Sequence, residues 1–97
     1  MNQTYTYIFE FRGGTYVSQV LATGLNESVN EWLKVISAQS SEIYQLGATT
    51  IKEIERYLEQ PKNREPVLLN NLQNVWFIDI HTKQGLGLVH IVQTVSA

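Results

Sequence analysis

The chain contains no cysteine and little charge, and both absences exclude classes of protein. Without cysteine there is no disulfide framework, no thiolate metal cluster and no thiol nucleophile. Only 16% of the residues are charged, against roughly 25% in soluble domains, so much of the surface must be uncharged. The formal net charge of -2 provides no electrostatic basis for binding nucleic acid, and we expect no such partner.

Long apolar runs are also missing. No stretch approaches the roughly 20 apolar residues that span a bilayer, so we expect no membrane partner. Residues 1–7 lack the basic and apolar regions of a signal peptide, and the lack of cysteine fits a reducing compartment. We therefore expect a soluble, cytoplasmic protein. Its 97 residues suit one domain, residues 1–97, large enough to bury a single core.

A strand hairpin is predicted at each end of the chain. In residues 5–22 apolar and polar residues alternate around Gly13-Gly14, whose glycines can adopt the positive φ angles of a two-residue primed turn. That loop pairs Phe9 with Ser18 and Tyr7 with Val20. One face then carries an apolar stripe, which we expect to be the core face: Tyr5, Tyr7, Phe9, Phe11, Tyr16, Val20 and Ala22.

The second hairpin, residues 75–95, has two predicted registers. A Gln84-Gly85 loop pairs Asp79 with His90. A three-residue loop that starts at Lys83 and has a left-handed Gly85 pairs Ile78 with His90 instead. The sequence alone does not choose between these registers.

Helical sequence lies between the hairpins. An apolar stripe at helical spacing predicts a first helix: Leu25, Val29, Trp32, Leu33 and Ile36. Thr23 or Gly24 is expected to cap it, although residues 28–31 also fit a capping box. A capping box at residues 50–53 predicts a second helix that ends before Pro61. Residues 42–46 are predicted as an isolated helical turn, and residues 61–74 as a loop whose segment 67–69 packs on the core.

The predicted fold is therefore α+β, with order β-β-α-α-β-β: two β-hairpins forming a single antiparallel sheet with helices packed on one face. The other face still carries large apolar side chains, which a solvated antiparallel face should not show so densely. That face carries Ile8, Val17 and Leu21, joined from the second hairpin by Val75, Phe77 and Val92 or by their alternating neighbours. As candidate interface residues we name Ile8, Val17, Leu21, Phe77 and Val92. Either a protein partner covers this face, or the 61–74 loop does, or the side chains are scattered surface aliphatics of the ordinary kind.

One segment resembles a known family. Two strands joined by a glycine turn, followed by Leu25-Asn26-Glu27-Ser28-Val29-Asn30-Glu31-Trp32-Leu33, resemble the opening of HicB-type antitoxin domains. The resemblance covers about the first third of the chain. The proline-glycine segment that this family has after its second strand is absent, because residues 22–24 run straight into the helix. No function and no residue role is carried over from it.

The candidate chemistry is sparse. Asp79, His81 and His90 could orient an imidazole as a general base or hold a metal, but we favour a cross-strand charge-assisted pair that stabilises the hairpin. The short glycine motifs match no phosphate-binding fingerprint and are predicted to be turns or close approaches. Basic residues of the second helix and its exit (Lys52, Arg56, Lys62 and Arg64) alternate with glutamates, which is typical of a solvated helix face.

These observations favour a small non-enzymatic interaction module. It would bind a protein partner or itself, as a homodimer, through the apolar sheet face. We expect no catalytic residue, no metal and no cofactor. The alternative is a small-ligand-binding protein or metal-dependent enzyme that uses Asp79, His81 and His90.

Overall fold

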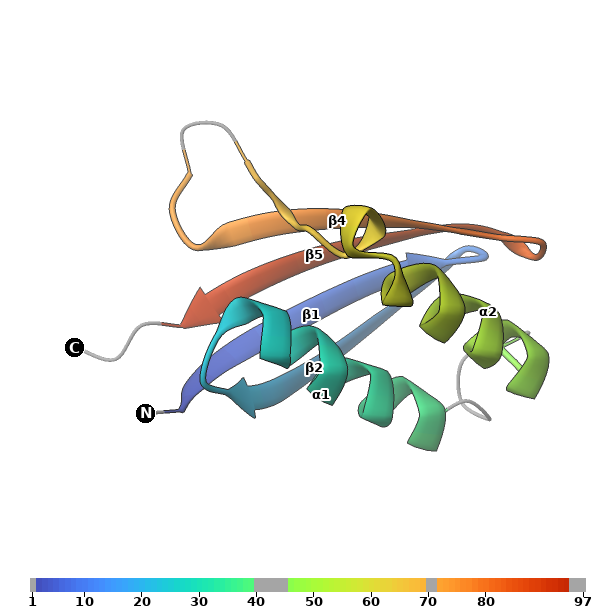
Figure 1. Ribbon diagram of the computed structural model, residues 1–97, viewed down its shortest axis with the longest axis horizontal. Coiled ribbons are helices and arrows are strands. Elements are labelled where there is room, and N and C mark those ends of the chain that lie inside the picture. The colour runs from blue at the N-terminus through green and yellow to red at the C-terminus, as the bar shows by residue number, and fades with distance from the viewer. Residues whose placement is uncertain (1, 40–45, 70–71, 95–97) are drawn as a thin grey trace.

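A computed structural model describes residues 2–39, 46–69 and 72–94, which form two layers (Figure 1). One layer is a five-stranded antiparallel sheet in the order β2-β1-β5-β4-β3, and helices α1 and α2 lie together on one of its faces. The elements are β1 (Gln3–Phe11), β2 (Gly14–Ala22), α1 (Leu25–Ala38), α2 (Ala48–Glu59), the 3-10 turn η1 (Pro61–Asn63), β3 (Val67–Leu68), β4 (Val75–Thr82) and β5 (Gly85–Thr94). The predicted α+β fold is confirmed, and β3 is an addition to it.

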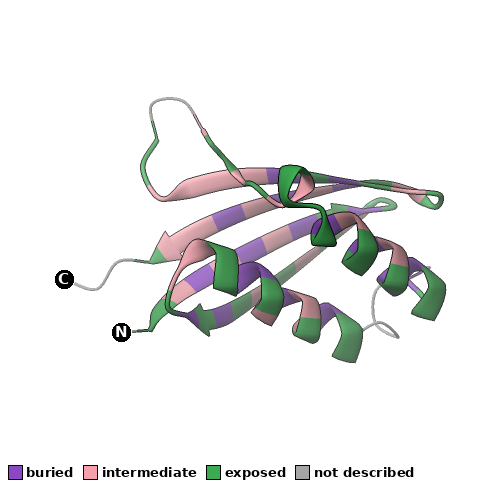
Figure 2. Ribbon diagram, viewed as in Figure 1, coloured by how far each residue is buried: buried purple, intermediate pink, exposed green. Residues whose placement is uncertain are grey.

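The core lies between the helices and the aromatic face of the sheet. Alternate residues of β1 are buried from Tyr5 to Phe11, which gives the banded colouring along this strand in Figure 2. The Trp32 ring of α1 stacks on Tyr7 at 5.1 Å between centroids and meets Phe9 edge-on at 5.3 Å. The predicted core stripe is therefore confirmed, because side chains alternate strictly between the two faces of a strand.

The first turn is formed by Arg12 and Gly13 and not by the glycine pair. Both residues have positive φ, 53° and 82°, and the pairing is Phe11 with Gly14. The predicted register was wrong by two residues, a shift that leaves every side chain on its predicted face. Arg12 is held in this conformation by a long-range contact, since its Nη1 donates to the carbonyl oxygen of Gln84 at 2.8 Å.

The second turn is formed by Lys83 and Gln84, so both predicted registers were wrong. Thr82 pairs with Gly85 and Phe77 pairs with His90. Within the turn, the Gln84 backbone N–H donates to Thr82 Oγ1 at 3.1 Å. From outside the hairpin, Glu53 Oε2 of α2 accepts the backbone N–H of Lys83 at 3.0 Å. The hairpin sequence contains no trace of this tertiary contact.

Helix α1 begins after Gly24, one of its two predicted caps, and its apolar stripe packs on the sheet. Helix α2 begins at Ala48, two residues before the predicted capping box, with Gly47 at its N-cap. Thr50 is consequently buried in the first turn and does not cap the helix. The helix ends at Glu59, just before Pro61, as predicted. Residues 42–45 of the predicted isolated turn lie outside the described residues.

Strand β3 corrects the prediction for the 61–74 loop. Val67 pairs with Phe77 and Leu68 pairs with Trp76, which adds a short edge strand to the sheet. The side chains of Val67 and Leu68 are 64% and 52% exposed, so neither packs on the core. The described part of this segment therefore extends the sheet sideways and does not cover its second face.

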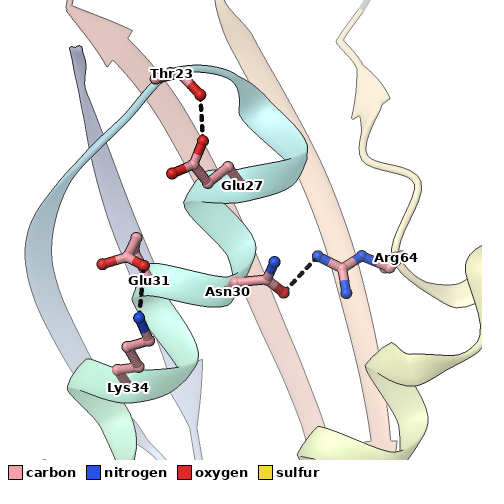
Figure 3. A network of polar contacts seen from close by, with 6 residues as sticks. All are labelled: Thr23, Glu27, Asn30, Glu31, Lys34 and Arg64. Carbon is pink, nitrogen blue, oxygen red and sulfur yellow. Dashed lines mark hydrogen bonds and ion pairs between the residues drawn. The ribbon is translucent and has the colours of Figure 1, made fainter.

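Arg64, which follows η1, links the two helices. Its Nη2 donates to Asn30 Oδ1 at 2.9 Å (Figure 3). Its Nε donates to Asn26 Oδ1 at 3.0 Å, and both asparagines are on α1. Its Nη1 donates to the Leu58 carbonyl oxygen of α2 at 3.3 Å. The planar guanidinium suits such a forked set of acceptors. Arg64 is thus a structural bridge and not one of a row of solvated cations.

Candidate functional site

The face of the sheet that points away from the helices, called here the open face, carries an uninterrupted row of side chains across all five strands. Strand register places Val17 beside Ile8, Ile8 beside His90, His90 beside Phe77 and Phe77 beside Val67. This central row is apolar except for its middle member. Val17 and Val67 at its ends are both 64% exposed, and the three residues between them are partly exposed. No described helix or strand covers the row.

The charges of the open face are few and gathered on one side of the central row. The row nearer the turns contains Glu10 and Asp79, both paired with Leu88 of β5. The row on the other side of the centre is uncharged: Gln19, Thr6, Val92 and Val75. No lysine or arginine occupies an open-face position of the described strands. The face is therefore apolar in the middle, acidic towards the turns and neutral towards the strand ends opposite them.

All five residues proposed as interface candidates from the sequence lie on this face. Ile8, Val17 and Phe77 belong to the central row, Val92 lies in the neutral row, and Leu21 lies beyond it beside Thr4. Leu21 is 60% exposed. The placement of Ile8, Val17 and Leu21 followed from strand alternation, which is insensitive to the two-residue error in the first hairpin. For the second hairpin, the observed register decides that Phe77 and Val92 lie on this face and that their alternating neighbours do not. Val67 was missed, because a two-residue strand has too little alternation to be recognised.

The second predicted constellation is split by the observed register. Asp79 and His81 are neighbours on β4, with 3.2 Å between Asp79 Oδ2 and His81 Nε2, and both side chains are more than half exposed. His90 instead lies against Phe77, with 5.2 Å between ring centroids. His81 pairs with Leu86, four residues from His90 along β5, a separation of about 13 Å. The two imidazoles therefore cannot share one ligand, and no group of three metal-ligating side chains occurs among the described residues.

A second surface feature is a groove between α2 and the turn that joins β4 to β5, called here the edge groove. It has a volume of about 560 Å³, and Lys52, Arg56 and Lys83 line it together with Tyr57 and His81. The Tyr57 and His81 rings touch, with 5.9 Å between centroids. Sequence reasoning missed the groove, because it requires the orientation of α2 relative to β4.

Comparison with protein-family models, with curated proteins and with solved structures returned no match to this chain. The partial resemblance in the first third of the sequence is accordingly not extended. None of the described helices is both long and apolar enough to cross a membrane. The function is therefore argued from the geometry alone.

Proposed function

We propose that this protein is a non-enzymatic interaction module of the cytoplasm, and that its open face packs against the open face of a second copy. The observation that supports this most strongly is the central row, which crosses every strand and whose apolar members are left in contact with water. Exposed apolar patches of this kind, rimmed by polar residues, mark interaction sites. Two such faces can pack as a β-sandwich, with the sheets about 10 Å apart.

A second copy is the favoured occupant because of how the charges are distributed. A face that packs on itself must use a two-fold axis that lies between the two sheets. If this axis runs along the central row, the acidic row of each copy lies over the neutral row of the other. Glu10 then approaches Thr6 of the second copy, and Asp79 approaches Val75. The carboxylates of the two copies then do not face one another, and each residue of the central row lies opposite the same residue of the second copy.

An axis that runs along β5 is the competing arrangement, and the charges disfavour it. It would place the acidic rows over each other, with Glu10 facing Asp79 across a partly desolvated interface. Like charges in such a position are unfavourable, and no lysine or arginine of the described strands is on the face to compensate them. The proposed dimer therefore has its strands antiparallel across the interface.

The first experiment is light scattering coupled to size-exclusion chromatography over a dilution series. Phe77→Asp and Ile8→Asp place a carboxylate in the centre of the proposed interface, where an unpaired buried charge should weaken dimerisation at least about 100-fold. Leu68→Asp is the matched control, because Leu68 is exposed on the same sheet but has the opposite orientation to the central row. A dimer that survives both central substitutions contradicts the open face as its interface, and a wild-type protein that is strictly monomeric contradicts self-association. In the monomeric case a different protein becomes the occupant to seek.

The orientation has its own test, which the lack of cysteine makes clean. A single Phe77→Cys substitution places equivalent thiols opposite each other only if the axis follows the central row. A short bis-maleimide should then cross-link the variant efficiently, whereas Leu68→Cys should remain unlinked. If the Phe77→Cys variant remains dimeric and unlinked, the proposed axis is wrong although the interface is right.

A further inference from the structure

The edge groove gathers cations from two separate parts of the chain. Lys52 and Arg56 lie one helical turn apart on α2, and Lys83 lies in the turn between β4 and β5. These are three of the seven lysines and arginines in the sequence. Glu53 is the one carboxylate among the described residues that line the groove. One side of an otherwise slightly acidic protein is therefore locally positive.

These cations also lack partners among the described residues. None of the Lys52, Arg56 and Lys83 side chains forms an ion pair or hydrogen bond there, whereas Lys34 pairs with Glu31 at 2.9 Å. The glutamates that alternate with the cations in sequence do not all share their side of the helix. Glu55 instead lines a different hollow between α1 and α2. The helix thus separates charges that appear mixed in the sequence.

The groove also offers hydrogen-bonding groups held by contacts with one another. Burial raises the pKa of Tyr57, and the nearby Asp79 carboxylate raises it further, so the phenol remains a hydrogen-bond donor at neutral pH. His81 lies against Tyr57 and is oriented by Asp79. Glu53 ties α2 to the backbone of Lys83, which joins the two walls at one end. The volume of about 560 Å³ falls within the range of small-molecule sites.

We propose that the edge groove binds a small phosphate-bearing molecule. Arg56 supplies the forked donor that matches two phosphate oxygens, while Lys52 and Lys83 add charge from either wall. Tyr57 and His81 contact the remainder of the ligand. No residue of the central row lines this groove, although Asp79, which orients His81, belongs to the acidic row of the open face.

Pyrophosphate is the probe for this site, and its binding is measured by isothermal titration calorimetry at low salt. The double variant Lys52→Ala/Arg56→Ala should bind it at least about tenfold more weakly, because two charged contacts of about 0.7 kcal/mol or more are lost. The matched control is Lys34→Ala/Lys62→Ala, which removes the same net charge from residues that do not line the groove. We expect its affinity to remain within about twofold of wild type.

Lys83→Ala provides an independent check from the strand side, and circular dichroism verifies that each variant is folded. Chemical shift changes in wild-type protein should map to α2 and to the turn between β4 and β5. The proposal is overturned if pyrophosphate gives no saturable binding up to about 10 mM, or if both double variants lose affinity equally. Equal losses would mean that the anion responds to net charge and not to this groove.

Discussion

The buried contact between Tyr7 and Ser28 allows a quantitative test of how α1 is attached to the sheet. Tyr7 Oη and Ser28 Oγ are 2.7 Å apart, and both residues have no exposed surface. Ser28 Oγ also donates its only proton to the Leu25 carbonyl oxygen, at 2.6 Å. Tyr7 must therefore be the donor to Ser28. Because Tyr7 donates and Ser28 accepts, removing the Ser28 hydroxyl and removing the Tyr7 hydroxyl should change the stability by different amounts.

Ser28→Ala leaves the Tyr7 hydroxyl buried without this acceptor, which costs about 1–3 kcal/mol. The better helix propensity of alanine returns about 0.5 kcal/mol, so a net loss of about 0.5–2.5 kcal/mol, centred on about 1.5 kcal/mol, is expected. Tyr7→Phe strands no donor, since Ser28 keeps its bond to Leu25, and should cost about 1 kcal/mol. The double variant should lose less than the sum of the two, with a coupling energy of about 1 kcal/mol.

Urea unfolding of the four proteins, followed by circular dichroism, measures these differences. For a domain of this size each 1 kcal/mol corresponds to a melting shift of about 4–8 °C. Equal slopes of unfolding free energy against urea are required, so that the four proteins can be compared as two-state systems. Strict additivity would refute the hydrogen bond, and a costlier Tyr7→Phe than Ser28→Ala would refute its direction.

The same tyrosine predicts a pH dependence. Burial raises the pKa of Tyr7 well above its ordinary value, outweighing the Ser28 hydrogen bond and the charge of Arg64, which both lower it. Above pH 10 the unfolded chain releases this proton while the folded protein retains it. The contribution of Tyr7 to the free energy of unfolding is therefore fully present below about pH 10. It falls as the pH rises further, by up to about 1.4 kcal/mol per pH unit. Tyr7→Phe should show a shallower fall than wild type between about pH 9.5 and 11, and parallel curves would contradict the burial argument.

Substitutions at three further positions test other contacts by the same unfolding measurement. Arg64→Ala should lower the free energy of unfolding by about 2 kcal/mol, because the hydrogen bonds that join α1 to α2 are lost. Arg64→Lys should restore little of this stability, because one ammonium group cannot replace the forked donors of the guanidinium. Full recovery by lysine would contradict the bridging role of Arg64. Gly87→Ala should cost about 1–3 kcal/mol, because its Cβ would lie 2.7 Å from Cε1 of the Phe9 ring; a neutral result would mean that the ring moves freely. Gly47→Asp should stabilise α2 by about 0.5–1 kcal/mol, since this uncapped position is open and extended; a loss would show that the cap is not formed.

The sequence predicted the two faces of the sheet better than it predicted the pairing of strands. Both hairpins shifted from their expected registers, yet the aromatic stripe from Tyr5 to Phe11 is buried and Ile8 and Phe77 lie on the open face. Alternation is a local property, whereas the turn positions depend on distant groups. Arg12 reaches the Gln84 carbonyl oxygen, and Glu53 reaches the backbone of Lys83. Neither contact can be seen within the hairpin that it shapes.

The candidate sites divide in the same way. Strand periodicity separates the two faces of each hairpin, so Ile8, Val17 and Leu21 of the open face could be named together in advance, whereas the face of the second hairpin depended on its register. The edge groove depends on which side of α2 meets β4, and a run such as Lys52, Glu53, Glu55 and Arg56 appears balanced until the helix is placed. His81 and His90 show the opposite case. Their proximity was a consequence of assumed registers and disappears with them.

Strand order has a consequence for how this protein reaches its native state. β5 follows β4 in the chain but lies between β4 and β1, so it joins the first hairpin to the rest of the sheet. Until β5 is in place, β1 and β4 each present an unpaired edge, and nothing connects them as strands. The pairing of β1 with β5 joins the most distant parts of the sequence, which is the kind of contact that slows folding. Loss of β5 would therefore divide the sheet into two separate parts, whereas loss of an edge strand would only make it narrower.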